Sequence, residues 1–420
     1  MTDKVLIGFE STPVFADNPR ALYEYLQLHQ ADEYDMIWIA RNSAQAAEYK
    51  QRGIECICPA DADFDARFSQ VMVIFSTHNS LLMRKKDYQI WITLWHGVGM
   101  KRSGYLNDFD IARMTEKNIA DSSKIDYFVT TSEFMRVILA AVMGMNVTRF
   151  LEFGQPRNDC LFSSDGQQIL SQVCGRDISA YQKVLLYLPT FRNHIGRHDG
   201  VTSVGHALGL EDYDEGDLDR WLREKGYLLV VKPHPSEDSP AEFQSTSNIV
   251  GLHETDLSRN DAYLNQMLNA VDLLITDYSS VQSDYLLLDR PILYIGTDEQ
   301  AYRETRGIFF DDLDFWICGP SVADLQSFET ESERLLVDPQ YFASERARFN
   351  TVVNAGHVNA CQRIAEFLHG TLPMDKNNLT RMAALAEANS HLQAELDSMR
   401  NSRAWKLAKL LGSPLRFLKR

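Results

Sequence analysis

Residues 273–294 read LLITDYSSVQSDYLLLDRPILY, and this stretch decides the fold. The apolar run from Leu273 to Ile275 predicts a buried strand, and the run from Ile292 to Ile295 predicts a second strand. Between the two strands lie a polar turn, residues 276–280, and a helix with an apolar face. Strand, turn, helix and strand form the repeating unit of a parallel sheet covered by helices. We therefore predict an α/β protein.

The polar turn contains Asp277, Ser279 and Ser280, at the point where a strand ends and a helix begins. Doubly wound sheets bind their ligands at this edge. Two hydroxyl groups and the backbone N–H groups of a helix start favour an anion, most simply a phosphate. The alternative is that these side chains only cap the helix, because Ser and Asp are common capping residues.

A second turn of this kind follows the predicted strand at residues 228–231. Its sequence is Lys232-Pro233-His234-Pro235, in which two prolines restrict the backbone. Alternatively, a lone Lys is solvated and a lone His is structural. Because Lys232 and His234 are held together at a strand end, we interpret them as phosphate-binding residues.

A third turn, WHGVGMK, follows the predicted strand at residues 90–94. His96 is a candidate general base, since the ordinary pKa of histidine lies near working pH. Gly97 permits close approach of a substrate to the backbone. The third glycine of a dinucleotide-binding motif is missing, which argues against a nicotinamide cofactor. Two more predicted strands, residues 150–153 and 185–188, lead into turns that contain Arg157, Thr190 and Arg192.

The motifs WHG, GQPRND, LPTFRN, KPHP and TDYSSVQSDYLLLDRP occur in this order between about Trp91 and Pro320. In this order they resemble the CDP-glycerol glycerophosphotransferases, which are teichoic acid primases and polymerases with related ribitol and capsule enzymes. The resemblance implies a GT-B-like fold of two Rossmann-like halves that face a cleft. It also implies transfer of glycerol phosphate or ribitol phosphate from a CDP-activated donor to a hydroxyl of a lipid-linked glycan or of a growing polymer. CMP would be released, in teichoic acid or capsule biosynthesis.

The resemblance also assigns roles to residues. His96 matches the proposed base, and His234 matches the histidine beside the donor phosphates. Ser279 and Ser280 match the pyrophosphate-binding turn, and Arg303, in YRETRG, resembles a loop that closes on the donor. We expect no metal and no cofactor. The complete set of candidate site residues is His96 and His234 for catalysis, Lys232, Asp277, Ser279, Ser280 and Arg303 for the donor phosphates, and Gly97, Arg157, Thr190 and Arg192 for other substrate contacts.

Two other functions remain open. A nucleotide-sugar glycosyltransferase or epimerase of the same fold would share the phosphate-binding half but would attack a sugar carbon. A non-catalytic, membrane-tethered nucleotide-binding scaffold would bind without turnover, and a histidine in a strand-end turn argues against it.

The amino-acid composition indicates the cellular compartment and restricts the classes of binding partner. The net charge of −16 argues against nucleic acid, which requires a basic face. The six cysteines are scattered, which suits a reducing cytosol and argues against a zinc site. The sequence shows no signal-peptide pattern and no apolar run of spanning length. We expect a cytoplasmic enzyme attached peripherally to the inner face of the cell membrane.

We divide the chain into an N-terminal acceptor-side domain (1–181), a C-terminal nucleotide-donor domain (182–372) and a helical tail (373–420). The last 21 residues, from Arg400 to Arg420, contain seven Lys or Arg and no acid, interleaved with apolar residues. This pattern is typical of an amphipathic helix on an anionic membrane surface. Alternatively, the tail packs on the acidic surface of the protein itself.

Overall fold

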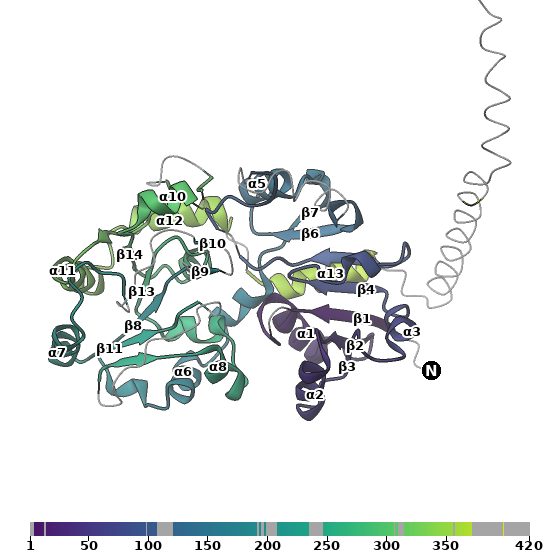
Figure 1. Ribbon diagram of the computed structural model, residues 1–420, viewed down its shortest axis with the longest axis horizontal. Helices are drawn as coiled ribbons and strands as arrows, with labels where there is room; N and C mark the ends of the chain where they lie inside the picture. The colour runs from purple at the N-terminus through teal and green to yellow at the C-terminus, as the bar shows by residue number, and fades with distance from the viewer. Residues whose placement is uncertain are drawn as a thin grey trace, which may run out of the picture.

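The chain is arranged as two halves, each built around its own parallel sheet (Figure 1). The computed structural model describes residues 4–11, 14–97, 99–106, 121–190, 193–194, 197–198, 208–234, 247–305, 307–309, 315–355, 358–371 and 398. Arg192 and nearly all of the predicted tail lie outside these residues. The predicted α/β, GT-B-like architecture is confirmed.

The N-terminal sheet has seven strands in the order β3-β2-β1-β4-β5-β6-β7, and every neighbouring pair is parallel. The strands are β1 (Val5–Glu10), β2 (Tyr34–Ile39), β3 (Cys56–Ile57), β4 (Val73–Ser76), β5 (Ile90–Thr93), β6 (Tyr127–Thr130) and β7 (Phe150–Glu152). The helices that accompany it are α1 (Asp17–His29), α2 (Ser43–Gln51), α3 (Phe64–Phe68) and α5 (Glu133–Met143), with short 3₁₀ turns η1 (Leu82–Arg84), η2 (Gly104–Leu106) and η3 (Val147–Arg149).

The C-terminal sheet has six parallel strands in the order β12-β11-β8-β13-β14-β15. The strands are β8 (Lys183–Leu188), β11 (Tyr227–Val231), β12 (Ile249–Gly251), β13 (Leu273–Thr276), β14 (Ile292–Ile295) and β15 (Ser321–Val322). The helices that follow α5 in the chain are α6 (Gly166–Cys174), α7 (Glu215–Lys225), α8 (Glu254–Arg259), α9 (Val281–Tyr285), α10 (Glu299–Thr305), α11 (Leu325–Val337), α12 (Ala343–Val353) and α13 (Ala360–Thr371), of which α13 returns to the N-terminal half. The 3₁₀ turns are η4 (Pro156–Phe162), η5 (Ile178–Ala180), η6 (Leu264–Ala270) and η7 (Leu286–Leu288), and a two-stranded antiparallel ribbon is formed by β9 (Asn193–His194) and β10 (Arg197–His198).

Both faces of each sheet are buried, which explains why the strands read as apolar runs instead of alternating patterns. In β4, for example, Ile74 joins one apolar cluster, while Val73 and Phe75 join another. Successive residues of a strand point to opposite faces, so two clusters are needed to cover them.

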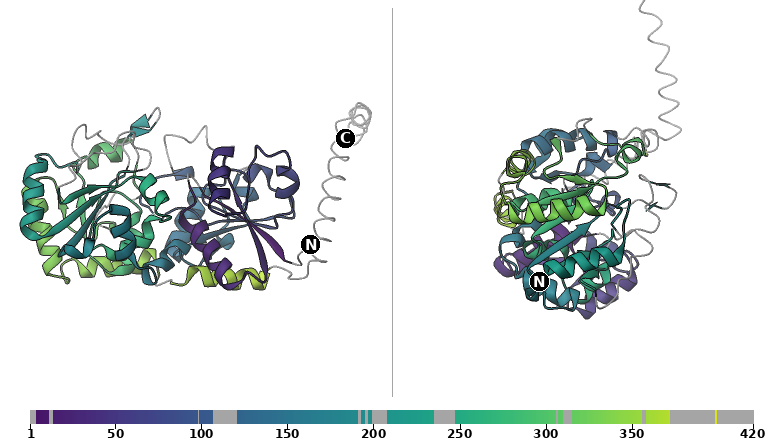
Figure 2. Two further views of the ribbon diagram at one scale, coloured as in Figure 1. Left: turned by 90° about the horizontal axis from the view of Figure 1, so that it is seen from below. Right: turned by 90° about the vertical axis from the view of Figure 1, so that its left-hand side faces the viewer.

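Helix α13 belongs to the N-terminal half in space, although it follows the C-terminal half in sequence (Figures 1 and 2). Ile364 and Leu368 are buried in the same cluster as the strands of the N-terminal sheet, and the ring of Phe367 lies 5.0 Å from that of Tyr127. The carboxylate of Asp159 accepts hydrogen bonds from the first two backbone N–H groups of α13, both at 2.8 Å. The chain therefore passes between the halves twice. A division of the chain into consecutive residue ranges does not describe this crossing, because α13 follows the C-terminal half in sequence but packs in the N-terminal half.

The segment 163–182, between β7 and β8, contains α6 and η5, and Leu170 and Val173 of α6 are buried in the core. One sequence-based expectation was wrong in detail. The helix after Ser280 is shorter than its apolar face suggested, since α9 spans five residues before η7 tightens the next turn. In the described part of the chain, no helix combines the length and the apolar character needed to cross a bilayer.

Candidate active site

Strand order brings the motif turns together at the carboxyl edges of the two sheets. In the N-terminal sheet, β1, β4 and β5 are neighbours, so the turns after Glu10, Ser76 and Thr93 lie side by side. In the C-terminal sheet, β8 lies between β11 and β13, so the turns that carry His234, Thr190 and Ser279 are adjacent. Parallel strands end at a common edge, which is where such sheets bind ligands.

The two edges meet at Gly97 and Ser280. A Cβ atom placed on Gly97 would lie only 2.5 Å from Oγ of Ser280, so no larger residue fits without movement. A Cβ atom on Gly99 would lie 3.5 Å from Cβ of the same serine. Gly97 was expected to permit close approach of a substrate. In the structure, the group that approaches it is the serine turn of the other half.

His96 lies in an aromatic environment at the end of β5. Its ring stacks on His78, with centroids 4.6 Å apart and planes inclined by 10°, and on Trp95 at 4.4 Å. Trp95 itself has a φ of 59°, a left-handed conformation that is strained for a bulky residue. Removal from water and the neighbouring His78 lower the pKa of His96 to about 4. The side chain nonetheless keeps an exposed surface, as a base that meets a substrate requires.

Arg157 is buried at the junction of the halves, with its guanidinium between two carboxylates. Nη1 lies 2.8 Å from Oδ1 of Asp17, at the start of α1, and Nη2 lies 2.8 Å from Oδ2 of Asp284, in α9. Nη1 also donates to the backbone oxygen of His96 at 2.9 Å. Burial alone would lower the pKa of Arg157, but Asp284 and Asp17 outweigh this effect and raise it. Arg157 therefore links the turn that carries His96 to both halves.

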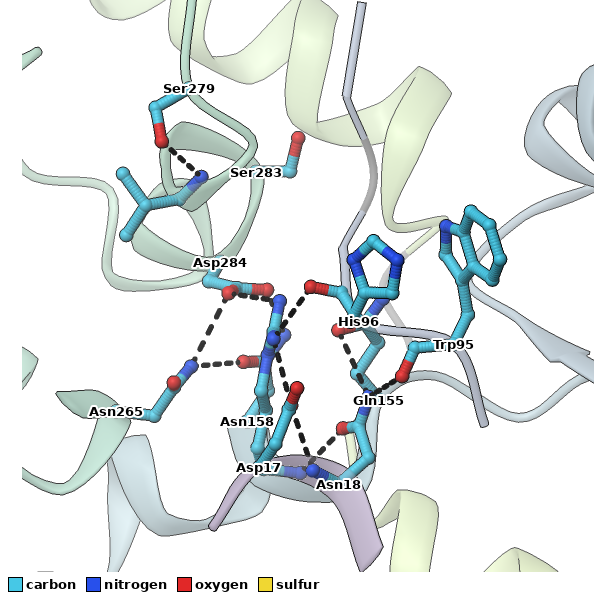
Figure 3. A network of polar contacts seen from close by, with 12 residues as sticks. Asp17, Asn18, Trp95, His96, Gln155, Asn158, Asn265, Ser279, Ser283 and Asp284 are labelled. Carbon is cyan, nitrogen blue, oxygen red and sulfur yellow. Dashed lines mark hydrogen bonds and ion pairs between the residues drawn. The ribbon is translucent and has the colours of Figure 1, made fainter. Parts of the chain in front are cut away.

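Amide side chains extend this network in both directions (Figure 3). On the C-terminal side, Asn158 donates to Asp284 at 2.8 Å, and Asn265 donates to the side-chain oxygen of Asn158 at 2.8 Å. On the N-terminal side, Asn18 donates to the backbone oxygen of Trp95 at 3.1 Å and accepts from the backbone N–H of Arg157. The turn at residues 95–97 is thus fixed by hydrogen bonds from two separate segments, since Asn18 lies in α1 and Arg157 lies in η4.

Two residues predicted to touch the donor phosphates have partners within the protein. Asp277 accepts from the backbone N–H of Thr190 at 3.0 Å and from its hydroxyl at 2.8 Å. These contacts join the turns after β8 and β13. Lys232 is 6% exposed, and its Nζ lies 2.9 Å from a carboxylate oxygen of Glu254 at the start of α8. A phosphate that reached Lys232 would have to share it with that carboxylate.

Three further predicted residues follow strands β11 and β13 of the same sheet. His234, Ser279 and Ser280 are partly exposed, and the hydroxyl of Ser279 accepts from the backbone N–H of Val281 at a long 3.5 Å. Arg303 lies on α10 and pairs with Glu299 at 2.9 Å. In the described residues, no group of three or more His, Cys, Asp or Glu side chains is arranged to hold a metal ion.

The segment after α10 contacts the N-terminal half directly. Lys101 and Ile308 form an antiparallel bridge, and the backbone N–H of Arg102 donates to the oxygen of Gly307 at 3.1 Å. The loop that resembles a donor-closing loop in sequence therefore joins the segment just after the His96 turn.

Sequence reasoning missed His78, Asp17 and Asp284 as members of the site. His78 follows β4, as His96 follows β5, so the same argument from strand ends could have found it. Asp284 lies within the quoted TDYSSVQSDY motif but one helical turn beyond the serines. Asp17 gives no local signal, because its partner Arg157 is 140 residues away.

Two parallel sheets with facing carboxyl edges define a GT-B-like fold, with a histidine turn at one edge and paired hydroxyls at the other. The family model described as CDP-Glycerol:Poly(glycerophosphate) glycerophosphotransferase matches residues 1–370. The chain belongs to this family.

Individual relatives agree with the family match. A teichoic acid poly(glycerol phosphate) polymerase of Staphylococcus epidermidis is 26% identical over 84% of this chain and 49% of its own length. A teichoic acid poly(ribitol-phosphate) polymerase of Bacillus spizizenii is 27% identical over 54% of this chain and 35% of its own length. The structure of the wall teichoic acid polymerase TagF superposes with a TM-score of 0.70 at 23% identity, covering 88% of this chain and 89% of that one. This chain spans about half the length of the first of these polymerases.

Replacing Arg157 by Met should lower the free energy of unfolding by about 3–5 kcal/mol, because the buried carboxylate of Asp284 and the partly buried carboxylate of Asp17 would lose their shared partner. Denaturant unfolding followed by circular dichroism measures this change. Arg303→Met is the matched control, since Arg303 has one ion pair within a single helix and should cost at most about 1 kcal/mol. Equal effects for the two variants would contradict the assignment of Arg157 as the link between the halves.

Proposed function

We propose that this protein transfers glycerol phosphate or ribitol phosphate from a CDP-activated donor to a hydroxyl of a lipid-linked glycan or of a growing poly(polyol phosphate). CMP is released, and the product contributes to teichoic acid or capsule biosynthesis. The observation that carries the proposal is the contact between Gly97 and Ser280, because it places the turn of a neutral histidine against a turn with two hydroxyls. Membership of the glycerophosphotransferase family supports the same reaction.

In this reaction His96 acts as the general base. The acceptor oxygen forms a bond to the β-phosphorus of the donor, and the bond from that phosphorus to the oxygen of CMP breaks. The hydroxyl proton goes to His96, and CMP leaves with the bonding electrons. A pKa near 4 keeps His96 neutral, and therefore able to accept a proton, at neutral pH.

Lys232, His234, Ser279 and Ser280 hold the donor pyrophosphate and stabilise the charge on departing CMP. The hydroxyls and the cations contribute most of this stabilisation, because the five-residue helix α9 has few aligned peptide dipoles. Asp277 and Thr190 support this turn through their mutual hydrogen bonds. Arg303 reaches the donor from α10. Arg192, which lies outside the described residues, is included as a donor contact because it follows Thr190 in the sequence.

A glycosyltransferase or epimerase would use the same phosphate-binding half. The family match and the close approach of Gly97, the residue after His96, to Ser280 favour attack on phosphorus instead of a sugar carbon. A non-catalytic scaffold would not require a precisely oriented base. The hydrogen bond from the buried Arg157 to the backbone oxygen of His96 fixes the turn that carries the proposed base, and it therefore favours an enzyme.

The basic segment from Arg400 to Arg420 attaches the enzyme to the anionic inner face of the cell membrane. Seven Lys or Arg without an acid, interleaved with Trp405 and Phe417, support this role. A lipid-linked acceptor would then meet the enzyme at the surface where it is anchored.

Turnover with a panel of CDP-glycerol, CDP-ribitol and UDP-sugars tests the proposed reaction. We expect CMP release from a CDP-polyol and no UDP or UMP release from the sugars. His96→Ala should lower turnover by about 10²–10⁴-fold, the usual contribution of general base catalysis. Donor affinity should be nearly unchanged, because His96 serves the acceptor. UDP-sugar turnover, or a His96→Ala variant with normal activity, would contradict the proposal.

Removing both hydroxyls in a Ser279→Ala, Ser280→Ala variant should weaken donor binding, since each hydrogen bond to a charged group contributes about 1.5–3 kcal/mol. Calorimetry with CDP-glycerol and with cytidine separates the phosphates from the base. Cytidine should bind the variant and the parent alike. A similar loss for both ligands would mean that the serines only maintain the fold.

Truncation before Arg400 should abolish binding to vesicles that contain anionic lipid, because each basic residue contributes about 1 kcal/mol at such a surface. Co-sedimentation measures this, and activity on a short, water-soluble acceptor is the control that should persist. Vesicle binding that is the same with and without the segment would exclude the membrane role and favour packing on the protein.

A further inference from the structure

A second imidazole lies beside the proposed base. The ring of His78 is nearly parallel to that of His96, with an interplanar angle of 10° and centroids 4.6 Å apart. Both side chains keep exposed surface at the carboxyl edge of the N-terminal sheet. The proposed reaction requires only one general base and leaves the role of the His78 ring unassigned.

A buried glutamate, Glu10, stabilises the turn that carries His78 by accepting hydrogen bonds from it. Glu10, at the end of β1, is 5% exposed. One of its carboxylate oxygens accepts from the hydroxyl of Ser76 at 2.7 Å, and the other accepts from the backbone N–H of Ser80 at 3.1 Å. The hydroxyl of Ser76 in turn accepts from the backbone N–H of Asn79 at 2.7 Å. The turn therefore has little freedom to move.

Asn79 ties the same turn to β5, the strand that carries His96. Its side-chain oxygen accepts from Nε1 of Trp91 at 2.8 Å and from the hydroxyl of Thr93 at 2.7 Å. Asn79 has a φ of 56°, a left-handed conformation that asparagine tolerates better than most residues. The two histidines consequently share one rigid frame, although they lie 18 positions apart in the sequence.

The orientation of the His78 ring is also fixed within the turn. Nδ1 of His78 lies 2.8 Å from the hydroxyl oxygen of the buried Thr77. This hydrogen bond, together with the stack on His96, fixes both the direction and the plane of the ring. Side chains held by their neighbours in this way are characteristic of preorganised sites.

We propose that His78 is a positioning residue for His96: its ring fixes the plane of the base so that a ring nitrogen meets the acceptor hydroxyl in line for proton transfer. This inference deepens the proposed function and depends on His96 being the base. A histidine on a turn otherwise samples several side-chain orientations, and small misplacements of a catalytic group lower the rate strongly.

The charged groups around the stack suit this role. Asp17, at the start of α1, and Glu10, at the end of β1, favour protonation of His78, but removal from water outweighs them and lowers the pKa of His78. Arg157, in η4, and His78 itself oppose protonation of His96, whereas Asp17 favours it. A neutral His78 can lie against the imidazolium that His96 becomes, whereas a charged ring would repel it.

Replacement of His78 by Ala and by Phe tests the proposal in the full chain. His78→Ala should lower kcat by about 10–100-fold while KM for CDP-glycerol and for a soluble acceptor changes by less than about threefold. His78→Phe restores a flat ring without a titrating group and should recover kcat to within a few-fold of the parent. His369→Ala, an exposed histidine on α13, is the matched control and should leave kcat unchanged.

Nuclear magnetic resonance of ¹³C-labelled histidine gives a readout that needs no turnover. In His78→Ala the His96 ring signals should shift and its pKa should rise towards 6.5, because the stacking ring that excludes water is lost. His78→Phe should retain the ring-current shift. These signals report on the stack even if the chain proves inactive with every CDP donor, so failure of the proposed function is recognised separately.

Three outcomes would overturn the proposal. Unchanged His96 signals in His78→Ala would mean that the rings do not stack in solution. A kcat of His78→Ala within twofold of the parent would mean that the stack has no effect on the base. A rise in acceptor KM that His78→Phe does not reverse would instead make His78 a direct acceptor contact.

Discussion

The structure depends on one buried arginine that two acidic residues share across the junction of the halves. Asp17 begins the first helix of the N-terminal half, Asp284 belongs to the helix behind the serine turn, and Arg157 lies between them. A guanidinium can make these contacts at once because it is planar, permanently charged and forked. Lysine has a single charged nitrogen and could not span both carboxylates while also donating to the backbone of His96.

This arrangement connects His96, the proposed base, to the serine turn, the proposed donor site, through a short series of contacts. The carbonyl oxygen of His96 accepts from Arg157, the same side chain binds Asp284, and Asp284 lies one helical turn beyond Ser280. The contact of Gly97 with Ser280 then leaves no room for a side chain at the glycine. A cost accompanies this precision, since burying three charges removes each from water. The hydrogen bonds of Asn158 and Asn18 to the network offset part of that cost.

The sequence predicted what local patterns encode and missed what only the tertiary structure brings together. Strands such as Leu273–Thr276 and Tyr227–Val231 were predictable because buried parallel strands read as continuous apolar runs. Ser132, a residue type common at helix starts, caps α5 by accepting a hydrogen bond from the backbone N–H of Met135. The sequence could not identify Glu254 as the partner of Lys232, or Asp17 as the partner of Arg157. The two members of each pair are distant in the sequence, and no local pattern distinguishes these carboxylates from the others in the chain. The short length of α9 was not predicted, because its apolar residues fit a longer helix equally well. The 3₁₀ turn η7, which follows α9, has no distinct sequence pattern.

Because α13 packs in the N-terminal half, the chain cannot be divided before β8 into two fragments that each keep a complete core. Ile364, Ala365 and Leu368 complete the apolar interior of the half that begins at the N-terminus, so a fragment that ends before β8 would expose the surface that they cover. A fragment that begins at β8 would carry α13 with its apolar face unpaired. Neither piece is a self-sufficient folding unit, even though the two sheets look like separate domains. Heating should therefore melt both sheets in a single cooperative transition, and the two fragments should recover a native-like fold only when they are mixed.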